Sequence, residues 1–182
     1  MKEKLIILAT SVVLALVAGE VLSSDDGHGK GFWKKTGDVA AVSNDQYREE
    51  CGACHFAYPP GLLPAASWEK LMQGLNEHFG DNAEIDPELN KTLSDYLMAN
   101  AADRSNYRRS VKLARSAGNG VPLRITEIGY FRKEHREIPA RMVKTNAKVG
   151  SLSNCTACHR RAEAGSFRER EIDIPGFGGW DD

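Results

Sequence analysis

Two copies of one short pattern constrain this chain more than any other feature. The sequence reads CGACH at residues 51–55 and CTACH at residues 155–159, and these two runs contain all four of its cysteines. A Cys-x-x-Cys-His run is the attachment pattern of c-type haem, because its thiols bond covalently to the macrocycle and its imidazole binds the iron. We therefore predict two covalently bound c-type haems, held by Cys51, Cys54 and His55 and by Cys155, Cys158 and His159.

A structural zinc site and two local disulfides are the alternatives for these cysteines. Zinc sites also use a Cys-x-x-Cys spacing, but tetrahedral thiolate binding does not require a histidine immediately after each pair. A disulfide within either pair closes too small a loop to stabilise the fold much. Both alternatives leave His55 and His159 unexplained, so haem attachment is favoured.

The N-terminal residues have the composition of an export signal. Residues 5–19 form an almost unbroken apolar run, shorter than the roughly twenty residues that a membrane-spanning helix needs. We predict a signal peptide over residues 1–24, with an uncleaved membrane anchor as the alternative. The predicted location of the protein is therefore the periplasm, where disulfides also form.

The remaining sequence predicts a mostly α protein with two unlike haem units. Residues 25–43 form a lead-in segment, and residues 44–116 form the N-terminal haem domain. Residues 117–182 form a smaller, irregular C-terminal haem domain that ends in an acidic, glycine-rich tail. This tail is either disordered or a strap over the second haem. The order of helices around the first motif resembles that of a small class I cytochrome c.

Capping residues and apolar spacing predict the helices of the N-terminal domain. One helix starts at Asn44 or Asp45 and leads into the first motif, and another starts at Asp86 with Pro87 at its first position. A third is expected from Ser67 to Phe79, with Ser67 as its cap. Its apolar stripe is Trp68, Leu71, Met72, Leu75 and Phe79. A short basic helix is expected over residues 107–115.

The group opposite each attachment histidine decides between electron transfer and ligand chemistry. His78 is expected at the core-facing edge of the third helix, and we predict it as the distal ligand of the first haem. His135 shares a side with Tyr130, Phe131 and Ile138 if that stretch is helical. We predict it as the distal ligand of the second haem.

The other candidates for these positions are His28 and three methionines. His28 lies in a glycine-flanked segment near the N-terminus, where a side chain is more often solvated, and its role stays open. Met72 is expected to pack in the core, and Met98 to point away from the apolar face of its own helix. Met142 is the remaining rival.

Two imidazoles on each iron predict a one-electron carrier rather than an enzyme. Such an iron is low-spin, has no open position and has a lower potential than an iron bound by histidine and methionine. The alternative is a haem enzyme or a gas-binding protein, peroxidase-like or a sensor, in which one haem keeps an open site.

Four segments together resemble one family: CGACHFAYPPGLLP, SWEKLMQGLNEHFG, LRITEIGYFRKEHREIPARMV and NCTACH. They resemble the bacterial dihaem cytochrome c family over roughly residues 45–170. The resemblance implies a periplasmic, bis-histidine protein that donates electrons to a small oxygen-binding high-spin cytochrome c, the sphaeroides haem protein. It also implies an upstream electron donor in the membrane, and it maps the distal ligands to His78 and His135.

The two predicted halves have opposite charge. Residues 44–103 contain eleven acidic and three basic residues, a net charge of −8, whereas residues 104–170 contain sixteen basic and five acidic residues, a net charge of +11. Three explanations stay open: docking of one half on the other, with arginines offsetting haem propionates, steering of a charged redox partner, or ordinary solvated surface. No nucleic-acid-binding motif is present, so nucleic acid is not an expected partner.

Overall fold

Short helices separated by turns make up residues 38–180, the part of the chain that this computed structural model describes. These residues contain α-helices, 3-10 helices and isolated bridges but no β-strand, so the predicted mostly α class is confirmed. The predicted signal peptide, most of the lead-in segment and His28 lie outside the described residues. Among residues 38–180, no helix has the length and apolar character needed to cross a bilayer.

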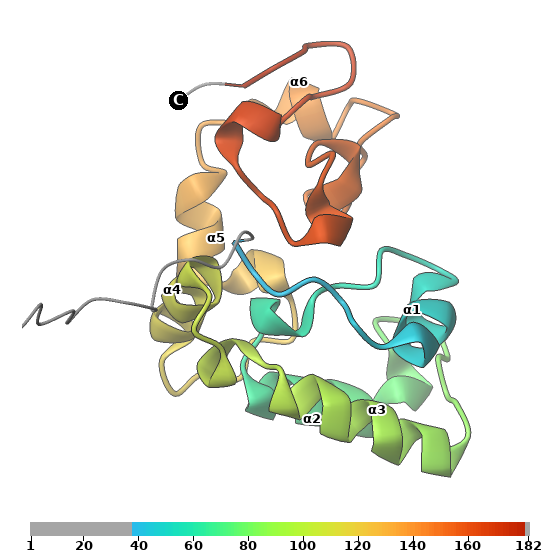
Figure 1. Ribbon diagram of the computed structural model, residues 1–182. Coiled ribbons are helices and arrows are strands. Elements are labelled where there is room, and N and C mark those ends of the chain that lie inside the picture. Colours follow the sequence, from blue (N-terminus) through green and yellow to red (C-terminus); the bar gives the residue numbers. More distant parts are fainter. Residues whose placement is uncertain (1–37, 181–182) are drawn as a thin grey trace, which may run out of the picture. The chain divides into compact units, whose positions relative to one another are not determined.

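The described part of the chain contains six α-helices and seven 3-10 helices. Figure 1 shows the arrangement of the α-helices. The α-helices are α1 (Asp45–Gly52), α2 (Ala65–Gln73), α3 (Pro87–Ala99), α4 (Arg108–Ala117), α5 (Gly129–Glu134) and α6 (Ala140–Val143). The 3-10 helices are η1 (Pro60–Leu62), η2 (Leu75–Glu77), η3 (Ala102–Arg104), η4 (Ile125–Glu127), η5 (Cys155–Ala157), η6 (Ala162–Ala164) and η7 (Glu169–Glu171). Helices α2 and α3 lie side by side, and α4 packs against α5.

Local capping signals determine where α1 and α3 begin, as predicted. The Asn44 side chain accepts a hydrogen bond from the backbone N–H of Tyr47, at 2.9 Å. The Asp86 carboxylate accepts from the N–H groups of Glu88 and Leu89, and Pro87 occupies the first helical position. These side chains satisfy backbone donors that have no partner within the helix.

The predicted helix over residues 67–79 is wrong at both ends. Helix α2 begins two residues earlier, after Pro64, and Ser67 is a fully buried residue inside the helix rather than its cap. The helix ends at Gln73 because Gly74, a poor helix former, turns the chain into η2. His78 therefore follows a 3-10 helix and does not lie on an α-helix.

The apolar stripes of α2 and α3 face the core, but Phe79 and Met98 do not lie where the sequence predicts. Trp68 and Met72 are buried as predicted, but Phe79 is 44% exposed because the chain has left the helix before reaching it. Met98 was expected to point away from the core, yet it is partly buried against the same hydrophobic cluster as Leu97. The flexible thioether side chain lets a methionine lean back toward the apolar face.

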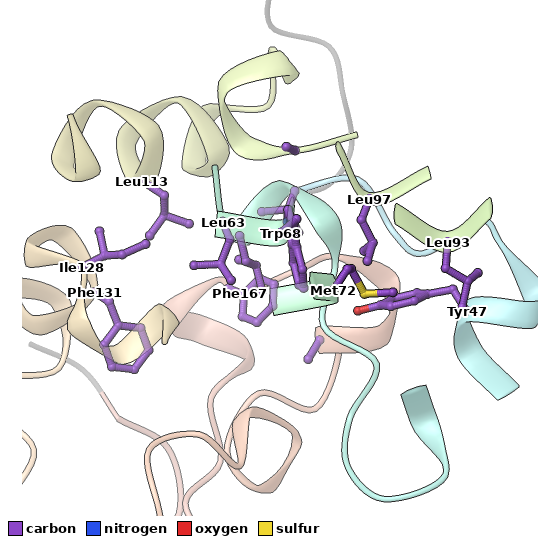
Figure 2. Packing of buried hydrophobic residues seen from close by; sticks show 14 residues of the cluster. Tyr47, Leu63, Trp68, Met72, Leu93, Leu97, Leu113, Ile128, Phe131 and Phe167 are labelled. Atoms are coloured by element: carbon purple, nitrogen blue, oxygen red, sulfur yellow. The ribbon is translucent and has the colours of Figure 1, made fainter. Parts of the chain in front are cut away.

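One hydrophobic cluster includes residues from both predicted domains (Figure 2). We call it the main cluster, and its buried members are Val39, Tyr47, Leu62, Leu63, Trp68, Met72, Leu93, Leu97, Ala101, Leu113, Ile128, Phe131, Ala162 and Phe167. A second group, the small cluster, consists of Met142, Val143, Val149 and Ile174. The division of the chain between residues 116 and 117 stays a prediction.

The start of the described chain is held against its C-terminal part. The backbone N–H groups of Asp38 and Val39 both donate to the carbonyl oxygen of Gly165, at 2.9 and 3.1 Å. The buried Asp38 carboxylate accepts from the N–H of Phe167 at 2.8 Å. Gly165 has φ of +70°, and a Cβ atom there would lie 2.4 Å from the carbonyl oxygen of Val39.

We expect Gly165→Ala to lower the free energy of unfolding by about 3 kcal/mol or more, because it adds a backbone clash to the cost of a left-handed alanine. Gly150→Ala is the matched control. Gly150 has a similar φ of +71° but open space around its Cα, so only about 1–2 kcal/mol should be lost. Chemical denaturation of the holoprotein measures both values. Equal losses would contradict the close approach of residues 39 and 165.

Candidate haem-binding sites

The first attachment motif extends from the last turn of α1 into the following turn. Cys51 is partly buried against the main cluster, whereas Cys54 and His55 are exposed. The Nδ1 atom of His55 lies 2.8 Å from the carbonyl oxygen of Phe56. Since a carbonyl oxygen only accepts, Nδ1 carries the proton and Nε2 keeps the free lone pair that a metal requires.

His78 lies opposite His55 in the structure. The two ring centroids are 6.2 Å apart and the ring planes differ by 19°. Two imidazoles that bind one metal ion from opposite sides, with each nitrogen at about 2 Å, would have ring centres about 6 Å apart. Burial lowers the pKa of His78, and the charges of His55 and Arg124 act in the same direction, which favours the neutral form that binds metals.

A tight turn, rather than a helix, positions His78. Its backbone N–H donates to the carbonyl oxygen of Asp81 at 2.7 Å, and the N–H of Asp81 donates back at 3.3 Å. Between them, Phe79 has φ of +60°, which is unfavourable for a residue with a side chain. The Arg124 guanidinium lies 3.8 Å from the centroid of the Phe79 ring. At an exposed site this cation–π contact contributes about 0.5–1 kcal/mol and offsets part of that cost.

The second attachment motif begins in η5 and pairs with a histidine that precedes it in the sequence. The ring centroids of His135 and His159 are 6.1 Å apart, with an interplanar angle of 73°. His135 Nδ1 lies 2.8 Å from the carbonyl oxygen of Phe131, so its Nε2 is again the nitrogen with a free lone pair. The Phe131 ring stacks on the His135 ring with centroids 3.9 Å apart.

The sequence predicts that Tyr130, Phe131, His135 and Ile138 share one side of a helix, but the helix is too short to include all four. Helix α5 ends at Glu134, and His135 is its C-terminal cap. Pro139 follows soon after, and the residue before a proline avoids helical geometry. Even so, Tyr130, Phe131, His135 and Ile138 all line one cavity.

This cavity has a volume of about 520 Å³ and a largely apolar wall, which is in the size range of cofactor pockets. It is also lined by Cys155, Cys158 and His159. Four arginines lie along it, Arg108, Arg109, Arg168 and Arg170. Another cavity of about 520 Å³ adjoins His55, and Thr156 from the second motif forms part of its wall.

His159 has the properties of a metal-binding imidazole. Its Nδ1 atom is buried and has no hydrogen-bond partner among the described residues, an expensive state unless a bound group contacts that atom. Burial, together with the charges of His135 and Arg109, lowers the pKa of His159 to about 4, although Asp38 acts in the opposite direction. The ring is therefore neutral at pH 7 and able to act as a ligand.

Residues 172–180 of the C-terminal tail fold against the second attachment motif, as expected of a strap. Ile172 forms an antiparallel bridge with His159, and the N–H of Asp173 donates to the carbonyl oxygen of Cys158 at 2.9 Å. Ile172 and Trp180 pack against the small cluster, and Ile174 is one of its buried members. Residues 172–180 thus form part of the wall of the cavity.

All four cysteines are free thiols, and each attachment motif has one further histidine beside it. Residues 38–180 contain no group of three His, Cys, Asp or Glu side chains placed to hold a metal ion. All four cysteines lie in this range, and none of them is in a disulfide. Each attachment motif instead has one additional imidazole at about 6 Å, the arrangement that suits an iron bound by two histidines. The donor set fits covalent haem, and the chain is a c-type cytochrome with two covalently bound haems.

It belongs to the dihaem cytochrome c family, which matches residues 47–167. The chain is similar to the dihaem cytochrome c from Shewanella baltica, with 43% identity, a TM-score of 0.64, and coverage of 76% of this chain and 98% of that one. It is also similar to the dihaem cytochrome c from Rhodobacter sphaeroides, with 42% identity, a TM-score of 0.61, and coverage of 71% and 100%. A search of curated proteins finds no match. Membership of this family implies a role in electron transfer.

Some residues that support these sites lie far from the attachment motifs in the sequence, and no local pattern marks them. Arg124 reaches the turn of His78, and Asp38 lies close to Arg109 beside the second cavity. Tyr58 contacts His55 from three positions later in the chain, but its second contact, with Ser153, lies 95 positions away and has no local signal. Only a three-dimensional structure or the covariation of distant positions carries a signal for such contacts.

We expect Ile174→Ala to lower the free energy of unfolding by about 2–5 kcal/mol, because a buried side chain in the wall of the second site is lost. Phe177→Ala removes a larger side chain from the same segment, but Phe177 is 46% exposed, so its effect should stay within about 0.5 kcal/mol. Denaturation of the holoprotein, followed by haem absorption, measures both variants. A similar effect of the two substitutions would contradict the packing of the tail.

Proposed function

We propose that this protein is a periplasmic one-electron carrier in which each haem iron is bound by two histidines. The proposed ligands are His55 and His78 for the first iron and His159 and His135 for the second. The proposed thioether residues are Cys51 and Cys54, and Cys155 and Cys158. The observation that carries this proposal is the pairing of imidazoles at 6.2 and 6.1 Å beside two attachment motifs.

The protein side chains account for a carrier without catalytic activity. Haem iron held by two imidazoles gains and loses one electron and has no free coordination position. Burial lowers the pKa values of His78 and His159 and so favours their neutral, metal-binding forms. The hydrogen bonds of His55 and His135 to carbonyl oxygens fix which nitrogen of each ring is left free to face a metal. Neither Met72 nor Met142 lines the cavities beside the attachment motifs; Met72 is a buried member of the main cluster and Met142 of the small cluster.

We expect His78→Ala and His135→Ala each to convert one haem to a high-spin form that binds carbon monoxide after reduction. Each substitution removes one of the two proposed axial ligands and opens a coordination position. The matched controls are Met72→Leu and Met142→Leu, which keep the volume of the rival side chains and should leave both haems low-spin. Electron paramagnetic resonance and absorption spectra report the spin state. An unchanged spectrum in either histidine variant, or a high-spin haem in a methionine variant, would refute the ligand assignment.

We also propose that a charged redox protein is the partner, of the small high-spin cytochrome c type named above, with a membrane donor upstream. Among the described residues, no ion pair joins the acidic segment 44–103 to the basic segment 104–170. Four ion pairs lie within one of the two segments. The others join Arg108 and Arg109 to Asp38, or Arg160 and Arg161 to the C-terminal tail. Opposite charges that are not paired with each other across the two segments can steer a charged redox partner.

The rate of electron transfer to such a high-spin cytochrome c should fall steeply as salt is added, because exposed charges are screened beyond about 10 Å at 0.1 M ionic strength. Stopped-flow measurements over a series of salt concentrations give this rate. A rate that does not respond to salt would contradict electrostatic steering.

A further inference from the structure

Tyr58 lies between the two attachment motifs and contacts both. Its ring centroid is 5.2 Å from that of His55, three residues earlier in the chain. Its hydroxyl group donates a hydrogen bond of 2.7 Å to the carbonyl oxygen of Ser153, which is 95 positions away in the sequence. The same carbonyl oxygen accepts from the backbone N–H of Cys155 at 3.0 Å. A continuous series of contacts therefore leads from His55 to Cys155.

The position of Tyr58 is fixed from several sides. The hydroxyl group of Tyr47 donates to the carbonyl oxygen of Tyr58 at 2.8 Å. The ring of Phe56 packs edge-on against the Tyr58 ring, at 5.5 Å between centroids. Pro59 and Pro60 follow and are almost completely buried, and their rings restrict the backbone. Tyr58 thus has little freedom to leave the Ser153 carbonyl group.

The hydroxyl group of Tyr58 is the donor in its hydrogen bond to Ser153, because a backbone carbonyl oxygen can only accept. Near this contact, Thr156 of the second motif lines the cavity beside His55, so the two motifs approach one another there.

We propose that Tyr58 is a positioning residue that couples the two haem sites. By holding Ser153 and Cys155 against the His55 side of the first site, it fixes the relative placement of the two motifs and with it the rate at which electrons pass between the haems. Tyr58 itself is neither oxidised nor a ligand in this role. The effect on electron exchange rests on the proposed function, whereas the effect on the placement of the second motif does not.

The test compares Tyr58→Phe with Tyr96→Phe in the holoprotein. Tyr58→Phe keeps the ring beside His55 and removes only the hydrogen bond to Ser153. Tyr96 also has a hydroxyl group that bonds to backbone, since it accepts from the N–H of Ser43 at 3.1 Å, but it does not reach the second motif. The two variants therefore lose the same chemical group, with and without the proposed link.

Two readouts are measured for each variant. The first is hydrogen–deuterium exchange of the backbone amides of residues 153–158, which should become about 2- to 10-fold faster in Tyr58→Phe because one hydrogen bond is lost. The second is exchange NMR of half-reduced protein, in which haem methyl signals report electron exchange between the haems; it should be slower in Tyr58→Phe. The Tyr96→Phe variant should match the wild-type protein in both.

Unchanged amide exchange in Tyr58→Phe would overturn the positioning role. Faster amide exchange with an unchanged rate of electron exchange would overturn its coupling of the haems. Failure of the proposed function is seen separately, as a high-spin haem in the wild-type protein. A Tyr58→Leu variant, which also removes the ring contact with His55, should slow electron exchange further. An equal rate in Tyr58→Leu and wild-type protein would likewise contradict the proposal.

Discussion

The separation of two imidazole rings is the constraint on which the rest of this structure depends. An iron bound from both sides needs ring centres about 6 Å apart, and the chain provides this spacing twice, at 6.2 and 6.1 Å. Different local structures hold the second histidine of each pair. A turn closed by backbone hydrogen bonds to Asp81 holds His78, whereas the end of α5 and the stacked Phe131 ring hold His135. The ring planes are nearly parallel at one site and steeply inclined at the other, so the two haems have unlike surroundings.

Contacts between distant parts of the sequence make these sites interdependent. The main cluster includes Tyr47 near the first motif and Phe167 after the second. Gly165 binds the backbone of residues 38 and 39, Arg124 covers the ring beside His78, and Tyr58 bonds to Ser153. A chain with so little regular structure relies on such specific contacts, because short helices contribute little stability of their own. The proposed electron carrier therefore has two haem sites that share one set of supporting residues.

Features governed by neighbouring residues are predictable from this sequence. The attachment motifs, the caps Asn44 and Asp86, and the basic helix α4 all follow from local chemistry. Features that depend on two conflicting local signals, or on contacts between residues far apart in the sequence, are not predictable in this way. Helix α2 ends just before Gly74, although the helical spacing of apolar residues continues to Phe79. His78 therefore lies in a turn, and Phe79 is exposed. The contacts of Tyr58 and Gly165 join residues about a hundred or more positions apart, and no local pattern encodes them.

The proposed function depends on two imidazoles at each iron. Electron paramagnetic resonance of the fully oxidised wild-type holoprotein tests it most directly, since spin state reports the axial ligands. We predict two low-spin ferric signals and no high-spin signal, with the two low-spin signals distinct because the imidazole planes differ by 19° at one site and 73° at the other. A high-spin ferric signal from either haem would contradict the account.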